Sequence, residues 1–518
     1  MDNFTQSVKG TSEVYSRVFQ KSREIIECSR DFILPDFYAD IRRIISYTGN
    51  ISPESCFVEN SKVTMSGALT TQVLFLDDDN KLRAVTFTQD YSSSIPVSDP
   101  GTYGDISLFC CPILENVSVK TVNPRKVSVR GRIDANMKLW KNTSVSPEIS
   151  DISGNNSSSY EIKTEKISYM KPFSIWERDL EVSDDIFIDG EAEEIIYCDA
   201  KSEVLETVSE NNSITVKGNI DVDVIYSPTD KRDPIHVRRR IPFTRTLESE
   251  FSALDSIVCC ACSYIRSADC SLSSVNAGEN NKIEVDVGYT LALNGAEVVS
   301  CEYVSDMYLP AFAVKNESEK ISFSSEPLKT VKMIRVESCT ESMLPEGSEI
   351  IISSVNPTVD SLSGESGARS AFGNSYINVA YKDRDGLFSS QSFSGDFEIE
   401  LPELADFDEY IFLVRVSSVN ARVEENRLCV GYDLEITVLS WKSEMSDVIR
   451  SSQVTANEER EIRKPLTVYY PSKNETLWDI GKKYNVPLSS LAASNPEYNS
   501  EKSASVLLIP RFKAGKKV

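Results

Sequence analysis

Residues 213–227 read SITVKGNIDVDVIYS, and apolar side chains alternate with polar ones along most of this stretch. Successive side chains of a β-strand point to opposite faces, so the pattern predicts a strand with one buried face and one solvated face. The stretch Lys62–Leu76 reads KVTMSGALTTQVLFL and has the same character. Both stretches carry an interior glycine, Gly67 and Gly218, at matching places. Two such strands roughly 150 residues apart indicate an internal repeat.

The repeat includes a second pair of strands. Three segments, which begin at Val117, Cys270 and Val414, can be laid over one another. Each contains a strand, a Val-Asn pair, a short polar link and a second alternating strand; the pairs are Val122-Asn123, Val275-Asn276 and Val419-Asn420. They recur about every 150 residues, which is an ordinary domain length. We therefore predict three tandem β units.

The first half of each unit repeats less regularly. In the third unit, residues 375–386 (SYINVAYKDRDG) take the place of the glycine-bearing strand, but this stretch is shorter and lacks the interior glycine. In the first two units the return strand ends in Ile-Pro, at Ile95-Pro96 and Ile241-Pro242. Helical spacing of apolar residues after Pro35 predicts one helix, over residues 37–45.

Strands joined by short turns favour antiparallel sheets. The sequence thus predicts a mainly β fold: three tandem antiparallel β-sandwich-like units followed by a small βααβ module. The predicted units span residues 1–165, 166–312 and 313–443, and the module spans 465–512. Residues 444–464 are polar and lack sustained alternation, which predicts a linker or an exposed helix.

The C-terminal module has its own local signals. Leu466–Tyr470 is an apolar strand, and Leu477, Ile480 and Tyr484 fall on one helical face. A second helix begins near Pro487, and Asn495-Pro496 ends it. Residues 506–509 return as a strand, while Trp478 suits either a core or an exposed position.

This module resembles the LysM domain. The matching pieces are Thr476-Leu477-Trp478-Asp479-Ile480, Lys483-Tyr484-Asn485-Val486, Leu491, Asn495-Pro496 and Leu508-Ile509-Pro510. The resemblance implies a shallow groove for N-acetylglucosamine polymers, formed by the loop after the first strand and the loop before the last. The groove positions carried over to this chain are Asn474, Glu475, Thr476, Leu477, Asn495, Pro496 and Ile509.

Two departures lie in the groove loops of this module. Asn474-Glu475-Thr476 replaces the Gly-Asp-Thr typical of LysM domains, and residues 502–505 lack the glycine expected before the last strand. Loss of glycine removes a permissive backbone position, so the loop amides are presented differently. These departures favour protein docking over glycan binding.

The long repeats resemble the SPOCS domain, a spore-coat repeat of endospore-forming bacteria. The resemblance is carried by Leu34-Pro35-Asp36, by the strand from Lys62 to Gly67, and by Ile241-Pro242-Phe243. Together with a C-terminal LysM module, the architecture resembles that of clostridial spore coat morphogenetic proteins. It implies a mother-cell protein at the forespore surface, in the spore coat. It also implies that this protein binds stage IV sporulation protein A, the coat-basement ATPase, largely through the LysM module.

Charge excludes some partners. The chain of 518 residues has a formal net charge of −24, which disfavours nucleic acid and anionic lipid. Residues 466–518 carry a net +4 and the remainder −28, which suggests two parts with different partners. We find neither a signal peptide nor an apolar run long enough for a membrane span, so we expect a cytosolic protein.

The twelve cysteines do not form a small-domain framework. In a reducing compartment they are expected to be small buried hydrophobic residues, for example Cys110, Cys111, Cys198, Cys301 and Cys429. The one cluster (Cys259, Cys260, Cys262 and Cys270) lacks paired C-x-x-C spacing, so core packing is favoured over a metal site. No cofactor is expected.

Catalytic motifs are scarce. The single histidine, His236, removes most schemes that need a histidine base or ligand. Residues 364–367 (GESG) resemble a nucleophile elbow, but Ala368 replaces the glycine that follows such a serine. Acidic runs at 77–79 and 191–194 are typical of solvated turns or strand edges. The basic run 238–240 pairs internally or docks an acidic partner.

The sequence therefore predicts a non-catalytic scaffold or adaptor of spore assembly. An alternative is a peptidoglycan-binding protein of the cortex or cell wall that uses Asn474–Leu477 and Asn495-Pro496.

Overall fold

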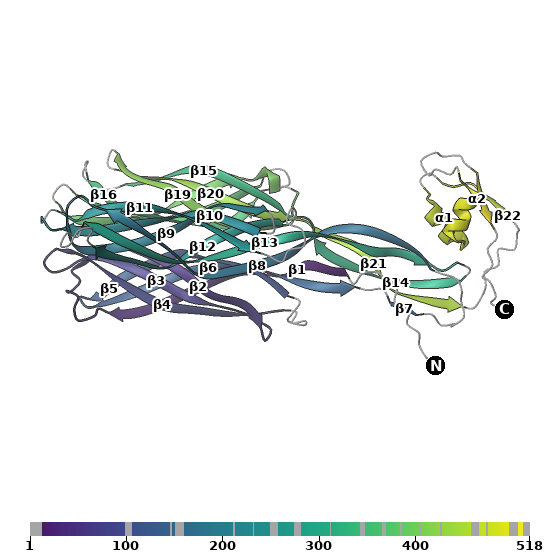
Figure 1. Ribbon diagram of the computed structural model, residues 1–518, viewed down its shortest axis with the longest axis horizontal. Helices are drawn as coiled ribbons and strands as arrows, with labels where there is room; N and C mark the ends of the chain where they lie inside the picture. Colours follow the sequence, from purple (N-terminus) through teal and green to yellow (C-terminus); the bar gives the residue numbers. More distant parts are fainter. Residues whose placement is uncertain are drawn as a thin grey trace.

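The computed structural model describes residues 13–98, 106–145, 148–150, 160–210, 213–230, 233–248, 257–273, 281–310, 312–341, 348–364, 369–383, 386–404, 406–424, 427–456, 466–472, 475–496 and 506–510. Strands dominate these residues, and apart from a 3-10 turn, η3 (Pro402–Leu404), their helices lie only in the C-terminal module. The molecule has a β-rich head, a narrower stem of strands, and the module at the far end of the stem (Figure 1). The prediction of a mainly β, antiparallel fold is confirmed.

The head contains three units of the same topology, each made of two antiparallel three-stranded sheets. In the first unit, one sheet has the order β2 (Arg43–Glu59), β3 (Lys62–Leu76), β4 (Leu82–Pro96), and the other β1 (Glu13–Ile33), β6 (Lys126–Val145), β5 (Ile106–Asn123). In the second unit the orders are β9 (Ala192–Glu210), β10 (Ser213–Pro228), β11 (Ile235–Glu248) and β8 (Glu161–Phe187), β13 (Lys282–Tyr308), β12 (Ile257–Ser273). In the third they are β16 (Glu349–Ser363), β17 (Ser370–Lys382), β18 (Phe388–Glu400) and β15 (Leu328–Glu341), β20 (Arg427–Trp441), β19 (Glu409–Glu424).

Each unit has its own core, to which both sheets contribute. In the first unit Val63 and Met65 of β3 share a buried cluster with Val127 and Val129 of β6. The alternating pattern explains this arrangement, because every second side chain of a central strand faces the other sheet. The second and third units have corresponding clusters.

Strand pairing corrects two details of the predicted repeat. The third unit does contain a glycine at the matching place of its central strand: Gly373 of β17 lies opposite Phe397, as Gly67 lies opposite Tyr91 and Gly218 opposite Phe243. Gly373 lies two residues before the stretch 375–386, because β17 (Ser370–Lys382) begins earlier than predicted. The two Ile-Pro pairs are not equivalent. Pro96 lies opposite Lys62 at the C-terminal end of β4, whereas Pro242 lies opposite Asn219 in the middle of β11.

The Val-Asn pairs also differ between units. Val122-Asn123 ends β5 directly before the turn to β6, as predicted. Val419-Asn420 instead lies within β19, at a register shift between Ser417 and Asn420, and the strand continues to Glu424. Val275-Asn276 lies outside the described residues.

Equivalent side chains of the three units meet between them. Leu74, Ile225 and Ala380 each follow the central-strand glycine by the same interval and belong to one buried cluster. A second buried cluster contains Phe109, Cys260 and Ile411, which face equivalent positions of their central strands. The units therefore pack around a common line with pseudo-threefold equivalence.

The stem gathers the strand that follows each unit. These strands are β7 (Glu148–Ser150), β14 (Ala313–Ser324) and β21 (Ser443–Ala456), in the order β14-β21-β7. Tyr303 of β13 packs with Ile321 and Val448 in the stem. The prediction of a linker or helix over 444–464 is thus wrong for residues 444–456, because pairing with β14 stabilises a strand there; residues 457–465 lie outside the described part.

The helix predicted over residues 37–45 is also absent from the described structure. Tyr38 donates its backbone N–H to Pro35 in a turn, and Ile41 donates to the Pro124 carbonyl. β2 then begins at Arg43, with Ile45 buried at a register shift. The apolar spacing reflects two separate burial sites, and tertiary contacts override the helical pattern.

The module has the order β22 (Leu466–Tyr469), α1 (Leu477–Tyr484), α2 (Leu488–Ser494), β23 (Leu507–Pro510), and its two strands pair antiparallel. Its core is formed by Ile480, Val486, Leu491, Leu507 and Ile509. Among the described residues, no helix combines the length and apolar character needed to cross a membrane.

Candidate functional site

The C-terminal module packs on the tip of the stem through α1. The Trp478 Nε1–H donates to the Asp306 carboxylate at 2.9 Å, and the Lys482 ammonium lies 2.6 Å from the same group. The Tyr308 hydroxyl donates to the Val486 carbonyl at 2.9 Å, and its ring meets Trp478 edge to face. Trp478 is therefore half-buried against the stem, so it is neither a residue of the module core nor freely exposed, the two positions that the sequence left open.

Further contacts close this interface. The Asn485 amide donates to the Phe312 carbonyl at 2.9 Å, and the Leu488 N–H donates to the Glu161 carboxylate at 3.2 Å. A Cβ at Gly481 would lie 2.6 Å from the Tyr308 oxygen, so only glycine allows this approach. Burial raises the pKa of Tyr308, which keeps its hydroxyl a donor. One face of the module is thus committed to the stem.

The predicted groove residues at the start of α1 have structural roles. The Glu475 carboxylate accepts hydrogen bonds from the Tyr469 hydroxyl and the Ser472 N–H, both at 2.9 Å. Thr476 is the N-cap of α1 and forms a capping box with Asp479. Hydrogen bonds from Thr476 lower the pKa of Asp479. Asn474 lies outside the described residues.

The other predicted positions divide similarly. Ile509 is fully buried and Leu477 packs against the same core, so neither presents a free surface. The Asn495 amide donates to the Leu508 carbonyl and its oxygen accepts from the Leu508 N–H, which ties the end of α2 to β23. Pro496 is exposed.

The structure exposes an apolar surface on the module that sequence reasoning missed. Val468 of β22 lies opposite Leu508 of β23, and their side chains are 52% and 37% exposed. Tyr470 and Val506 flank them and are 73% and 48% exposed. These four residues form what we call the outer sheet face. The sequence did carry a signal for this surface. Residues 506–509 are all apolar, but only one side of a strand's pleat can face the core, so the other side must be exposed.

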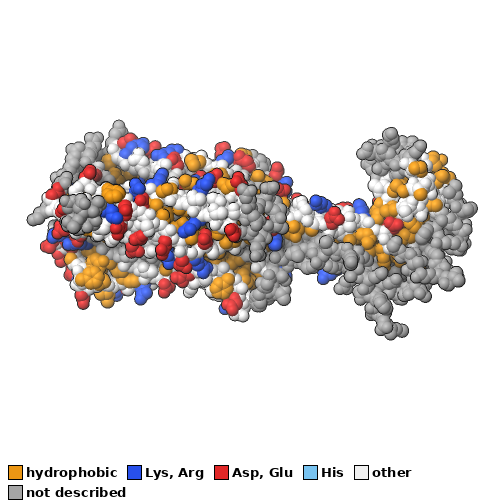
Figure 2. All heavy atoms as spheres, in the orientation of Figure 1, with side chains coloured by type: hydrophobic (Ala, Val, Ile, Leu, Met, Phe, Trp, Pro, Cys, Tyr) orange, Lys and Arg blue, Asp and Glu red, His pale blue; other side chains and the backbone are white. Residues whose placement is uncertain are grey.

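Side-chain chemistry differs along the molecule. Figure 2 shows hydrophobic side chains gathered on the module, whereas acidic and basic side chains intermingle over the head. A large exposed apolar patch on a polar protein is typical of an interaction surface.

The basic run on β11 is neutralised internally. Arg238 and His236 both bond Asp223, at 2.8 and 2.7 Å, and Arg240 bonds Asp221 on the neighbouring strand. Burial alone would raise the pKa of Asp223, but the hydrogen bonds from His236 and Arg238 bring it below its usual value. Of the two possibilities for this run, the structure has internal pairing.

Two disulfides correct the expectation of unpaired cysteines. Cys198 is bonded to Cys270 and Cys339 to Cys429.

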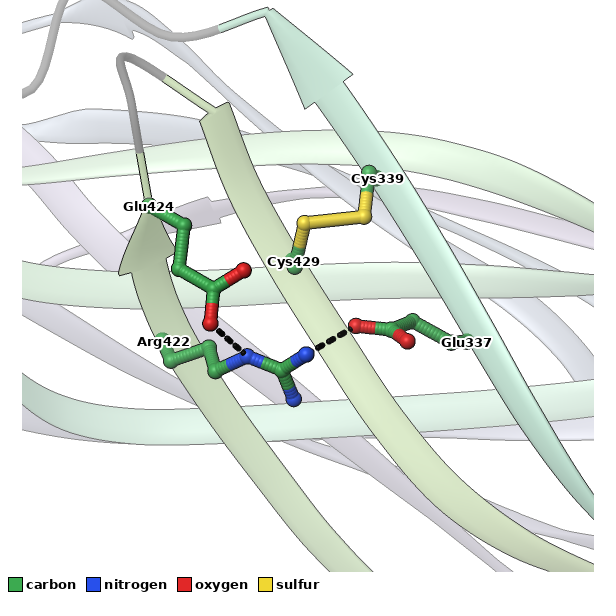
Figure 3. Close-up of a disulfide and its surroundings, with 5 residues drawn as sticks. All are labelled: Glu337, Cys339, Arg422, Glu424 and Cys429. Atoms are coloured by element: carbon green, nitrogen blue, oxygen red, sulfur yellow. Dashed lines mark hydrogen bonds and ion pairs between the residues drawn. A yellow bond between two sulfur atoms is a disulfide. The ribbon is translucent and has the colours of Figure 1, made fainter.

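In the described part of the chain, one group of side chains, Glu337, Cys339 and Cys429, has its potential ligand atoms close enough together to hold a metal ion. Figure 3 shows that its two sulfurs are bonded to each other, while Arg422 holds Glu337 and Glu424. Five of the cysteines expected to pack without a disulfide do so, namely Cys110, Cys111, Cys259, Cys260 and Cys262.

A cavity of about 460 Å³ lies between the three units. Asn50, Lys201 and Asn356 reach it from equivalent strands, and the sulfurs of Cys111 and Cys262 lie 3.3 Å apart in its wall. Arg415 crosses from the third unit to the Val204 carbonyl and pairs with Glu435. The GESG residues 365–367 and Ala368 lie outside the described residues.

One family model, described as SipL, SPOCS domain, matches residues 40–122 and 191–272. The two segments cover β2–β5 and β9–β12, the same four strands of the first and second units. No curated protein and no solved structure matched the chain. Residues 40–122 and 191–272 are thus similar to the SPOCS domain, which supports a sporulation-related role. The third unit and the module lie outside both segments, so their family assignment stays a prediction.

Proposed function

We propose that this SPOCS-domain chain is a non-catalytic scaffold of spore assembly that docks a partner protein through its C-terminal module. It recruits or stabilises the coat basement layer at the forespore surface, in the mother cell. The two matched SPOCS segments support the sporulation setting. The observation that carries the docking role is the outer sheet face, Val468, Tyr470, Val506 and Leu508.

The position of this face supports docking. The module is fixed to the stem through α1, by Trp478 and Lys482, so the module is held in one orientation at the end of the molecule farthest from the head. A rigidly held apolar face binds at a lower entropic cost than one on a free tether. By resemblance, the partner is the coat ATPase that is similar to stage IV sporulation protein A.

The chemistry of the head supports a structural role for the three units. His236 is bound to Asp223, and the metal-like group at Cys339 is a disulfide. General-base catalysis needs a titratable group that faces a substrate, and this histidine is instead held in a cross-strand ion-pair cluster.

The test is co-purification of the full chain with the coat ATPase. A double variant, Val468→Ser with Leu508→Ser, removes apolar area from the outer sheet face without touching the core. We expect at least a tenfold loss of binding with an unchanged melting temperature. The control is Leu387→Ser, which removes an exposed leucine (56%) from the head. Undiminished capture by the double variant would contradict the docking face.

A second arm separates the alternative function. The full chain is sedimented with purified peptidoglycan, and Pro496→Ala is compared with the wild type. Retention that Pro496→Ala weakens and Leu508→Ser leaves unchanged would favour the glycan-binding alternative at the cortex or cell wall. Failure to sediment supports protein docking.

A further inference from the structure

Two cysteines occupy the same place in neighbouring units. Cys111 of β5 lies opposite Asn136 of β6, and Cys262 of β12 lies opposite Ala292 of β13, which is the equivalent register position. In the third unit this position holds Leu413. Since the three units pack around one line, the pseudo-threefold relationship itself brings Cys111 and Cys262 together.

The two thiols are in direct contact. Their sulfurs lie 3.3 Å apart, and the Asn294 amide donates to the Cys111 sulfur at 3.2 Å. A disulfide needs a sulfur separation of about 2.05 Å, so the two sulfurs must approach by roughly 1.3 Å to form one.

The pair is accessible to small molecules although it lies between units. Both Cys111 and Cys262 line the cavity of about 460 Å³, a volume that admits a small oxidant. Cys262 is only half-buried. Of the other thiols nearby, Cys260 donates to the Asn294 carbonyl at 3.3 Å, which turns its sulfur toward its own sheet.

We propose that Cys111 and Cys262 are a modification site: a thiol pair that a small disulfide or a diazene oxidises to a covalent bond between the first and second units. With a small disulfide, one cysteine thiolate attacks and releases the first small thiol. The second cysteine thiolate then attacks the mixed disulfide and releases the second small thiol. The two protons lost by the cysteines are carried by the two released thiols, so the exchange is balanced.

The bond would add a new kind of connection. Cys198–Cys270 lies within the second unit and Cys339–Cys429 within the third, so neither disulfide of the described chain joins two units. Cys111 and Cys262 are separated by 151 residues, and cross-links that close long loops restrict the unfolded chain most. Oxidation would therefore lock the first two units together and raise the melting temperature.

Protonation sets the rate of this reaction. Its hydrogen bond with Cys262, together with burial, raises the pKa of Cys111. Because the thiolate is the attacking species, cross-linking accelerates as pH rises above neutrality.

The test treats the folded full chain with diamide or oxidised glutathione, blocks remaining thiols, and maps cross-linked tryptic peptides. Cys111 shares its peptide with Cys110, and Cys262 shares its peptide with Cys259 and Cys260, so single substitutions are needed to assign the bond. Cys111→Ser and Cys262→Ser should each abolish the new peptide and the rise of several degrees in melting temperature. Cys28→Ser, a half-buried thiol elsewhere in the first unit, should leave both unchanged.

Two outcomes would overturn the proposal. One is a folded wild-type chain whose Cys111 and Cys262 are both recovered as blocked thiols after oxidation. The other is a cross-linked peptide that persists in Cys262→Ser, which would assign the bond to Cys259 or Cys260.

Discussion

Gly373 of β17 lies directly opposite Phe397 of β18. A Cβ at Gly373 would lie 2.3 Å from the Phe397 ring and 2.2 Å from the Thr358 carbonyl oxygen. The glycine is therefore enclosed by the Phe397 ring and by the backbone of β16. The first and second units repeat this relationship; the pairs are Gly67–Tyr91 and Gly218–Phe243. The third unit, which the family model does not match, thus has the same local packing rule.

The glycine-aromatic contact should be sensitive to one added methyl group. Gly373→Ala forces the Phe397 ring or the backbone of β16 to move, and overpacking of this kind costs about 1–3 kcal/mol. We expect the thermal transition of the third unit to move to lower temperature, as measured by calorimetry on the full chain. Phe372→Ala, on the solvated face of the same strand, is the control and should change the transition less. Equal melting of Gly373→Ala and the wild type would show that the contact is loose.

Local patterns predicted the strands but not how they associate. Apolar and polar residues alternate along most of residues 213–227, so β10 is determined by its own sequence. By contrast, β21 has weak alternation and becomes a strand only because β14, more than 100 residues earlier, pairs with it. The same limit applies to the candidate site: helices α1 and α2 follow from local signals, but which face of the module stays free depends on Asp306 and Tyr308 of the distant stem. Sequence alone therefore assigned groove roles to Glu475 and Asn495, which hold the module together.

The contact between the first and third units contains a buried ion pair. The Lys138 ammonium lies 2.8 Å from the Glu409 carboxylate, and both side chains are largely buried. Burial lowers the pKa of Lys138, and Glu409 opposes that change. Glu409→Gln leaves the ammonium without a neutralising charge, so we expect a loss of roughly 3 kcal/mol, seen as a lower denaturation midpoint. Lys21 also pairs with Glu409 but is 57% exposed, so Lys21→Ala should cost less than about 1 kcal/mol. If Lys21→Ala destabilised the chain more than Glu409→Gln, the buried Lys138–Glu409 pair would not be the stabilising contact.

The Asp223 cluster predicts a specific acid sensitivity. Although burial opposes ionisation, bonds from His236 and Arg238 lower the folded-state pKa of Asp223 below its unfolded value. The folded state therefore binds fewer protons, and this stabilisation is present above about pH 4 and is lost as pH falls through the folded pKa. The difference in melting temperature between the wild type and Asp223→Asn should shrink from pH 7 to pH 3. Asp78→Asn, at an exposed turn outside the Asp223 cluster, is the control variant. If the difference in melting temperature between the wild type and Asp223→Asn stayed constant from pH 7 to pH 3, the ionisation of Asp223 would not be coupled to folding.

Asp306 controls where the module sits. Its carboxylate accepts from Trp478 and pairs with Lys482, and it is the one acidic side chain of the described stem that contacts both. Asp306→Ala removes both bonds. Hydrogen bonds to charged groups contribute about 1.5–3 kcal/mol each, more than the neutral hydrogen bonds of Tyr308 and Asn485 that remain. We expect the module to detach, which small-angle scattering would detect as a larger radius of gyration and hydrogen exchange as faster exchange around Tyr308. Glu302→Ala, an exposed position on the same strand, is the control and should leave both measurements unchanged.

The outer sheet face does not contact Asp306, so partner capture should survive in Asp306→Ala. It should weaken, because a detached module loses its fixed orientation. A scattering curve identical to that of the wild type would show that Tyr308, Phe312 and Glu161 hold the module without Asp306.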